Sequence, residues 1–421
     1  MPIQGKNPRA LATDGTRVFV AIFESGNRSM ILPASIVANP AGPYGGLSPP
    51  PNSGSSFNPP LAPGLPAPPP TGLIINKEGV NWKDDNNHIW DALVTWNLNE
   101  NDIAAIQVSN LAVSYAKNVL NINMAIAVNP ATGRVTPVGT YGPNEHRFEE
   151  ATRNNLRTRL GFVDPNNIGA IPGVVDLNQH LFLNPPNPQL LKTSATPAER
   201  HIGISDPRGI AWLANGSAVY VSGMGSNNVV KAHPTNGSRL ATIDVGAGPT
   251  GLVLDETRSR LYVLNRFEAT VSAVNLATNL EVGRASFFDP TPAVIKNGRP
   301  LLYDAHLTSQ LGNFACAGCH IDATRDTEDW DLGDPQGAMK TLNQPCNTGT
   351  GLSGTCNDWH PMKGPMMTQT LIGSVGTEPL HWRGDREDTA AFSVGFTGLL
   401  GADSPPSPAE MAKLEAFLAT Q

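Results

Sequence analysis

The sequence predicts a multidomain protein that is mainly β over residues 1–290 and ends in a small α-helical domain over residues 296–421. Only 15% of the residues are charged, whereas glycine and proline number 41 and 38, which favours short strands and turns over long solvated helices. Residues 206–283 contain a tandem repeat of strand-like segments, and from about residue 296 the pattern becomes helical around a pair of cysteines. A length of 421 residues also exceeds one average core, so two domains are expected.

The tandem repeat has a period of 42 residues. Gly209 and Gly251 occupy the same position in the two copies, and so do Tyr220 and Tyr262. Each copy reads as short alternating strands separated by Gly, Pro and Asn turns, which is typical of a four-stranded propeller blade. In sequence, the copies resemble the YVTN-type β-propeller repeat.

Two further segments repeat the opening of this unit. Residues 7–20 form a third copy, and residues 124–135 form a fourth, degenerate one. Propellers typically need four to eight blades around their axis, and about five fit before residue 290. The prediction therefore includes a ring that is incomplete at its N-terminal end.

A proline-rich insertion interrupts the repeats at residues 39–72. Pro-Pro runs alternate there with Gly and Ser, a composition that cannot bury a core, so we expect an extended, mobile loop. A ligand for a proline-recognition domain is the alternative. The tryptophans that follow, Trp82, Trp90 and Trp96, are expected in the core or at the rim of a blade rather than in a ligand site.

One short motif in the C-terminal domain indicates a cofactor. Cys316 and Cys319 are separated by two residues, and His320 follows directly. Two such cysteines on one helical turn reach the two vinyl groups of a porphyrin and the adjacent imidazole reaches the iron, so the motif predicts one covalently attached haem c. A redox dithiol, half a zinc site and a coincidence are the alternatives. No second cysteine or histidine pair completes four zinc ligands, and no βαβ pattern surrounds the motif.

The surroundings of the motif carry a family resemblance. The lead-in at residues 298–309, the segment 368–373 and the segment 377–386 occur in the order of three elements of a known family. Together they resemble the first haem domain of bacterial di-haem cytochrome c peroxidases, which implies a c-type cytochrome domain fused to the propeller. Residues 407–418 are predicted to close this domain as a capped helix whose apolar face consists of Met411, Leu414, Phe417 and Leu418.

The second axial ligand of the iron is expected in the methionine-rich segment after the motif. Met362 and Met366 lie 42 and 46 residues after His320, which is far enough for the chain to cross the other face of the haem. A thioether ligand would raise the reduction potential, whereas an imidazole from His360 or His381 would lower it. We favour Met366 or Met362, with Met366 and His320 as the metal ligands, over either histidine.

These features predict a c-type haem protein that transfers electrons to a redox partner, with the propeller as a docking or scaffold module. One alternative is an enzyme that reduces hydrogen peroxide, as the family resemblance implies. Against it, the Gln of that family's acid–base pair is missing after Arg386, where Glu387 and Asp388 stand, and no second Cys-x-x-Cys-His is present. The other alternative is a propeller binding protein with a structural haem.

The net charge and the cysteines limit which partners and which cellular compartment can be expected. A net charge of −7 and a pI near 5.7 argue against nucleic acid, and no apolar run predicts a transmembrane segment. Haem c is attached outside the cytoplasmic membrane in bacteria, so we expect a periplasmic or extracellular protein, although no signal peptide is present and the true N-terminus is expected to be missing or misassigned. In that oxidising compartment Cys346 and Cys356 are expected to form a disulfide, with two inert thiols as the alternative.

Overall fold

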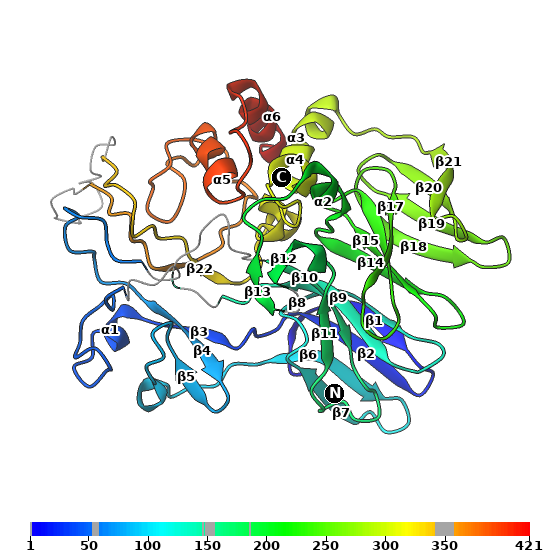
Figure 1. Cartoon of the computed structure of the whole chain (residues 1–421), viewed down its shortest axis with the longest axis horizontal. Helices are drawn as coiled ribbons and strands as arrows, with labels where there is room; N and C mark the ends of the chain where they lie inside the picture. The colour runs from blue at the N-terminus through cyan, green and yellow to red at the C-terminus, as the bar shows by residue number, and fades with distance from the viewer. Residues whose placement is uncertain (1, 53–58, 145–146, 148–155, 185–186, 342–357) are drawn as a thin grey trace.

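The computed structural model shown in Figure 1 describes the whole chain except residues 1, 53–58, 145–146, 148–155, 185–186 and 342–357. The described chain is mainly β and contains four antiparallel four-stranded sheets. Blade 1 consists of β1 (Lys6–Thr13), β2 (Arg17–Glu24), β6 (Asn101–Gln107) and β7 (Val113–Lys117), and blade 2 of β8 (Ile122–Val128), β9 (Val135–Tyr141), β10 (Arg157–Phe162) and β11 (Gly173–Asp176). Blade 3 consists of β14 (Pro207–Trp212), β15 (Val219–Gly223), β16 (Asn228–Ala232) and β17 (Arg239–Asp244), and blade 4 of β18 (Pro249–Asp255), β19 (Arg260–Asn265), β20 (Thr270–Asn275) and β21 (Leu280–Ser286).

The first strands of the four blades lie side by side in chain order. β1 packs beside β8, β8 beside β14, and β14 beside β18, which is the arrangement of inner strands in a propeller. Each of these strands has a register shift near its start, between Pro8 and Ala10, Asn123 and Ala125, Pro207 and Gly209, and Pro249 and Leu252. The openings that repeat in the sequence therefore correspond to recurrent β-bulges or irregularities.

Blade 4 ends the series. The described chain has four blades rather than the expected five or so, and within it no packing of comparable extent joins β18 to β1. The two equivalent glycines of the repeat show the difference. A Cβ on Gly209 would lie 2.1 Å from the Thr250 carbonyl oxygen of blade 4, whereas the nearest atom to a Cβ on Gly251 would be 3.7 Å away, within blade 4 itself. No described blade thus covers the face of blade 4 that points away from blade 3, and Val253 of this blade is 65% exposed.

The described part of residues 39–72 contains no helix or strand, as predicted for a loop, but this loop is one part of a larger folded insertion between β2 and β6. The insertion contains α1 (Ala34–Val37) and a three-stranded sheet of β3 (Ser29–Leu32), β4 (Leu73–Glu78) and β5 (Asn81–Lys83). Trp82 and Trp90 are buried in the core of this sheet and not in a blade, and Trp96 packs against the same core. The proline-rich part contacts the C-terminal segment, because the Ala62 amide donates to the Pro335 carbonyl oxygen (2.8 Å). In Figure 1 the insertion lies on the opposite side of the molecule from blade 4.

The C-terminal segment begins with α3 (Ala293–Tyr303) and ends with α6 (Pro408–Leu418), and these two helices pack together. The predicted closing helix is confirmed: Ser407 and Glu410 form a capping box, and the four predicted apolar residues are buried. The core of this segment also includes Leu156 and Met224 from the blade region, so a separate cytochrome domain is not shown. Its other described α-helices and strands are α4 (Ala305–Thr308), α5 (Ser393–Gly398), β22 (Asp329–Asp331) and β23 (Pro365–Met367), and 3₁₀ helices lie at Cys316–Gly318, Ile321–Ala323 and Ala390–Phe392.

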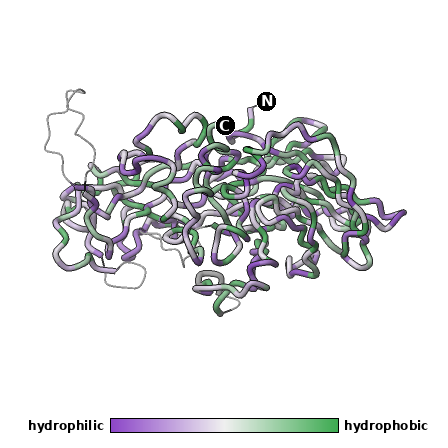
Figure 2. The backbone as a smooth tube through the Cα atoms, turned by 90° about the horizontal axis from the view of Figure 1, so that it is seen from above, coloured by the Kyte–Doolittle hydropathy of each residue, from purple (hydrophilic) through white to green (hydrophobic). Residues whose placement is uncertain are grey.

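Four small elements of the described chain connect blade 2 to blade 3. They are the 3₁₀ helix η2 (Gln179–Leu181), β12 (Phe182–Asn184), β13 (Asn187–Leu191) and α2 (Pro197–Ile202). Hydrophobic and hydrophilic residues are interspersed along the described backbone (Figure 2), and none of the described helices has the length and apolar character needed to cross a bilayer.

Candidate functional site

The cysteine motif begins eight residues after the end of the short helix α4 (Ala305–Thr308). Cys316–Gly318 form one 3₁₀ turn rather than a full helical turn. The approach to the motif is fixed by Asp304, whose Oδ1 accepts hydrogen bonds from the His306 and Leu307 amides (2.9 and 3.1 Å) and so caps α4. The Asn227 side chain of blade 3 donates to the other oxygen of Asp304 (2.9 Å). The lead-in that the sequence predicts is therefore anchored to the propeller.

The two cysteines border an apolar core. Both pack against the cluster that contains Phe314, Trp330 and Phe396, and neither forms a disulfide with another described residue. Burial raises the pKa of the Cys316 thiol to about 11, which keeps it protonated at neutral pH. Among the residues that the structure describes, no group of three or more His, Cys, Asp or Glu could hold a metal ion without a cofactor.

The His320 ring is largely buried and is held through one of its two nitrogens. Its Nδ1 lies 2.8 Å from the Gln369 carbonyl oxygen, and a hydrogen bond from Nδ1–H to this oxygen leaves Nε2 for a ligand. Burial lowers the pKa of His320 to about 4, the Gln369 carbonyl opposes this shift, and the neighbouring His381 reinforces it. The imidazole is thus neutral at physiological pH, as a metal ligand must be. Gln369 belongs to segment 368–373, one of the three resembling elements.

An ionic link joins the motif to two inner strands of the propeller. Asp322, two residues after His320, accepts from Arg9 Nη1 of β1 and from Arg208 Nη1 of β14, each at 2.8 Å. Burial alone would raise the pKa of Asp322, but Arg208 and Arg9 outweigh this effect and hold it below its ordinary value. Asp322 has a left-handed φ of 53°, a conformation that Asp tolerates better than most residues. Sequence reasoning missed this link, because Arg9 lies 313 residues from Asp322.

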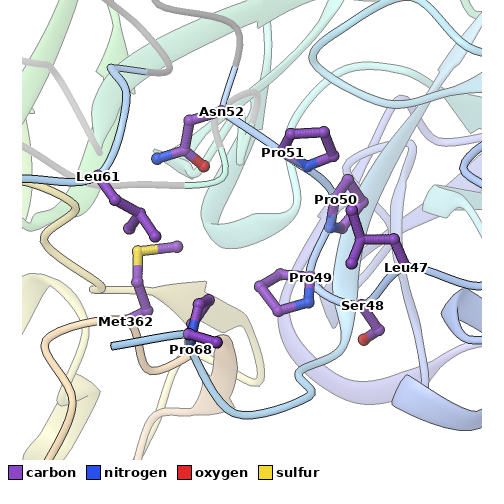
Figure 3. Close-up of a pocket in the computed structure, with 10 residues that line it drawn as sticks. Leu47, Ser48, Pro49, Pro50, Pro51, Asn52, Leu61, Pro68 and Met362 are labelled. Atoms are coloured by element: carbon purple, nitrogen blue, oxygen red, sulfur yellow. The ribbon is translucent and has the colours of Figure 1, made fainter. Parts of the chain in front are cut away.

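Two of the predicted distal candidates face away from the motif. Met362 is 2% exposed and lines a pocket formed mainly by the proline-rich insertion, including Pro49, Pro50 and Pro68 (Figure 3). His360 uses both ring nitrogens within the protein, since Nδ1 accepts from the Met362 amide (3.0 Å) and Nε2 is 3.0 Å from the Pro66 carbonyl oxygen.

The other two candidates lie nearer to the motif. Met366 pairs with Trp330 across β22 and β23, and directly opposed residues of an antiparallel pair point to the same face. Trp330 belongs to the core that borders both cysteines. Met366 therefore lies on the face of the β22–β23 pair that points toward this core. His381 reaches the same region by another route, through Phe392, which packs on this core and whose ring centroid is 4.7 Å from that of His381.

Two more predictions concern the acidic pair after Arg386 and the second pair of cysteines. The side chains of Glu387 and Asp388 are exposed, and Asp388 accepts a hydrogen bond from the Ala391 amide (2.9 Å). The expected disulfide between Cys346 and Cys356 lies outside the described residues.

Comparisons with known proteins add no family. No family model matches the chain, and no curated protein matches it either. Among solved structures, it is similar to a nidogen/laminin complex, with 12% identity and a TM-score of 0.32 over 68% of this chain and 82% of that one. A putative 6-phosphogluconolactonase from Bacteroides uniformis has 8% identity and a TM-score of 0.32 over 68% of this chain and 59% of its own.

A third similar structure is a virginiamycin B lyase from Staphylococcus aureus, with 14% identity and a TM-score of 0.28 over 63% of this chain and 61% of its own. The chain thus spans less than two thirds of the lactonase and of the lyase. Likenesses this weak carry no argument about function, which has to rest on the residues of this chain.

Proposed function

We propose that this chain is a c-type haem protein that transfers electrons, and that its propeller holds the haem-binding segment in place. Cys316 and Cys319 would form the two thioethers, and His320 would bind the iron through Nε2. The haem, when bound, supplies an iron that changes oxidation state by one electron. The residues of the chain would attach this group, orient it and partly bury it.

The observation that carries the proposal is the environment of His320. A metal-ligating histidine usually donates its second ring N–H to a carbonyl or carboxylate, which fixes the ring and its tautomer. The Gln369 carbonyl provides this contact in a chain where Cys-x-x-Cys-His supplies the two thiols. A redox dithiol would need no such oriented histidine.

The propeller's part in the proposal rests on the contacts of Asp304 and Asp322. Asn227 binds the first, and Arg9 and Arg208 bind the second, so both sides of the motif are tied to the blades. Electron transfer benefits from a cofactor held rigidly at one place, since its distance to a partner then stays constant. An exported location follows from the same proposal, because bacteria attach haem c outside the cytoplasmic membrane.

The test is expression in a bacterium that attaches haem c, with export to the periplasm. Haem is expected to stay with the denatured polypeptide in the wild type and in a His201→Ala control, whose side chain is 59% exposed. It should be lost in a Cys316→Ala, Cys319→Ala variant. Absence of covalent haem from the folded wild type would refute the proposal, and a high-spin ferric protein that reduces peroxide would favour the peroxidase alternative.

A further inference from the structure

His381 resembles His320 in how the protein orients it. Its Nδ1 lies 2.9 Å from Oδ1 of the buried Asp385, and no described residue hydrogen-bonds to its Nε2. A carboxylate behind a histidine is a common arrangement at metal sites, where it fixes the ring and strengthens the ligand. His381 also has a left-handed φ of 69°, and conformations of this kind often occur at functional sites.

The contacts of its neighbours place His381 near His320. Trp382 Nε1 donates to the Met367 carbonyl oxygen (2.7 Å), and two residues later the Gln369 carbonyl oxygen contacts His320 (2.8 Å). A single extended stretch of chain therefore touches both histidine-bearing segments. The Phe392 ring, which contacts His381 edge-on, packs on the core that borders Cys316 and Cys319.

A second observation indicates that the same loop faces an anionic group. The Nε atoms of Arg383 and Arg386 are buried, and neither has a hydrogen-bond partner among the described residues. Arg383 Nη2 pairs with Asp385 (3.2 Å), whereas no described acid pairs with the Arg386 side chain. Arg383 Nη1 also donates to the His360 carbonyl oxygen (2.9 Å), so Arg386 is the arginine available for another anion. A buried donor without a partner is costly, and Arg386 Nε is therefore suited to a carboxylate that the protein itself does not supply. A haem carries two such carboxylates, its propionates.

Resting on the function proposed above, we infer that residues 381–386 form the second half of the haem site. His381 is the second axial ligand of the iron, Asp385 orients it, and Arg386 binds a propionate. Of the rival ligands, His360 and Met362 are engaged elsewhere, so Met366 is the competitor that an experiment has to separate from His381.

The experiment uses the haem-loaded full chain and compares His381→Ala with Met366→Leu. The ferric wild type is expected to be low-spin by optical and electron paramagnetic resonance spectroscopy. His381→Ala should become high-spin while keeping its covalent haem, and added imidazole should restore the low-spin spectrum. Met366→Leu should stay low-spin.

The opposite pattern, low-spin His381→Ala with high-spin Met366→Leu, would overturn the inference, and so would a low-spin state in both variants. If His381→Ala does not fold, His381→Met provides the second variant, which should stay low-spin but with the higher reduction potential typical of methionine ligation. An unchanged potential would contradict the assignment. A wild type without covalent haem would refute the proposed function itself, which is a distinct result.

Discussion

Replacement of Glu328 by Gln should reduce the pH dependence of stability by a predictable amount. Glu328 precedes β22 and lies between the C-terminal segment and the propeller. Its Oε1 accepts from Asn121 Nδ2 (2.7 Å) and its Oε2 from Asn27 Nδ2 (2.9 Å). Burial, reinforced by the charge of Asp326, raises its pKa from 4.5 to about 8.

The sign and size follow from proton linkage. A carboxyl whose pKa is higher in the folded than in the unfolded state makes the folded state bind more protons, so stability falls as the pH rises from about 4.5 to about 8. At about 1.36 kcal/mol per pKa unit, the wild type should lose roughly 3 kcal/mol of unfolding free energy through this group between pH 5 and pH 7.5. The Gln variant lacks this loss, although one weakened hydrogen bond costs it about 1 kcal/mol at every pH.

The assay is urea denaturation from pH 5 to pH 7.5, with the difference between wild type and Glu328→Gln plotted against pH. The other buried acids with raised pKa values, such as Asp102 and Asp331, act equally in both proteins and cancel in this difference. Glu387→Gln, at an exposed carboxyl, is the control and should give a flat difference. A flat difference for Glu328→Gln as well would refute the reasoning.

Two further substitutions test how the segments pack. Asp322→Asn removes a charge that binds both Arg9 and Arg208, so it should lower the unfolding free energy by about 1–3 kcal/mol, whereas Asp255→Asn removes a charge that binds only Arg258, whose side chain is 75% exposed, and should have a smaller effect. Equal effects in denaturation experiments would show that Asp322 is not an anchor. Gly298→Ala places a Cβ 2.1 Å from the Lys413 carbonyl oxygen of α6, and should destabilise the protein by about 1–3 kcal/mol. Gly283→Ala, which has open space around its Cβ, should change the melting temperature little, and a neutral Gly298→Ala would contradict the close packing of α3 and α6.

The sequence predicted best what depends on local patterns. Blade openings carry repeated Pro and Gly residues, and the closing helix carries its own cap and apolar face, so both are recognisable without tertiary information. The loop predicted at residues 39–72 has no helix or strand in its described part, but the sheet beside it was not predicted, because its strands β3 and β4 pair across more than 40 residues. No local pattern records such a pairing.

The candidate site was predictable only in part for the same reason. Cys316, Cys319 and His320 are adjacent in the chain, so their spacing alone identifies them. The distal side depends on how residues 360–386 fold back, and loop length could not show that Met362 faces the proline-rich insertion. The separation of four residues between His381 and Asp385 was a usable signal, since it allows a carboxylate to reach an imidazole.

The uncovered outer face of blade 4 has a consequence for how the propeller unfolds. A closed ring loses blades only by breaking two interfaces at once, whereas blades in an open series depend on their nearest neighbours like units of a linear array. Blade 4 has one neighbouring blade in the described chain, and it should therefore exchange its amide hydrogens sooner than blade 3. Blade 3 is clamped between blades 2 and 4 and carries Arg208 and Asn227, so the contacts that hold the cysteine motif come from a protected part of the array.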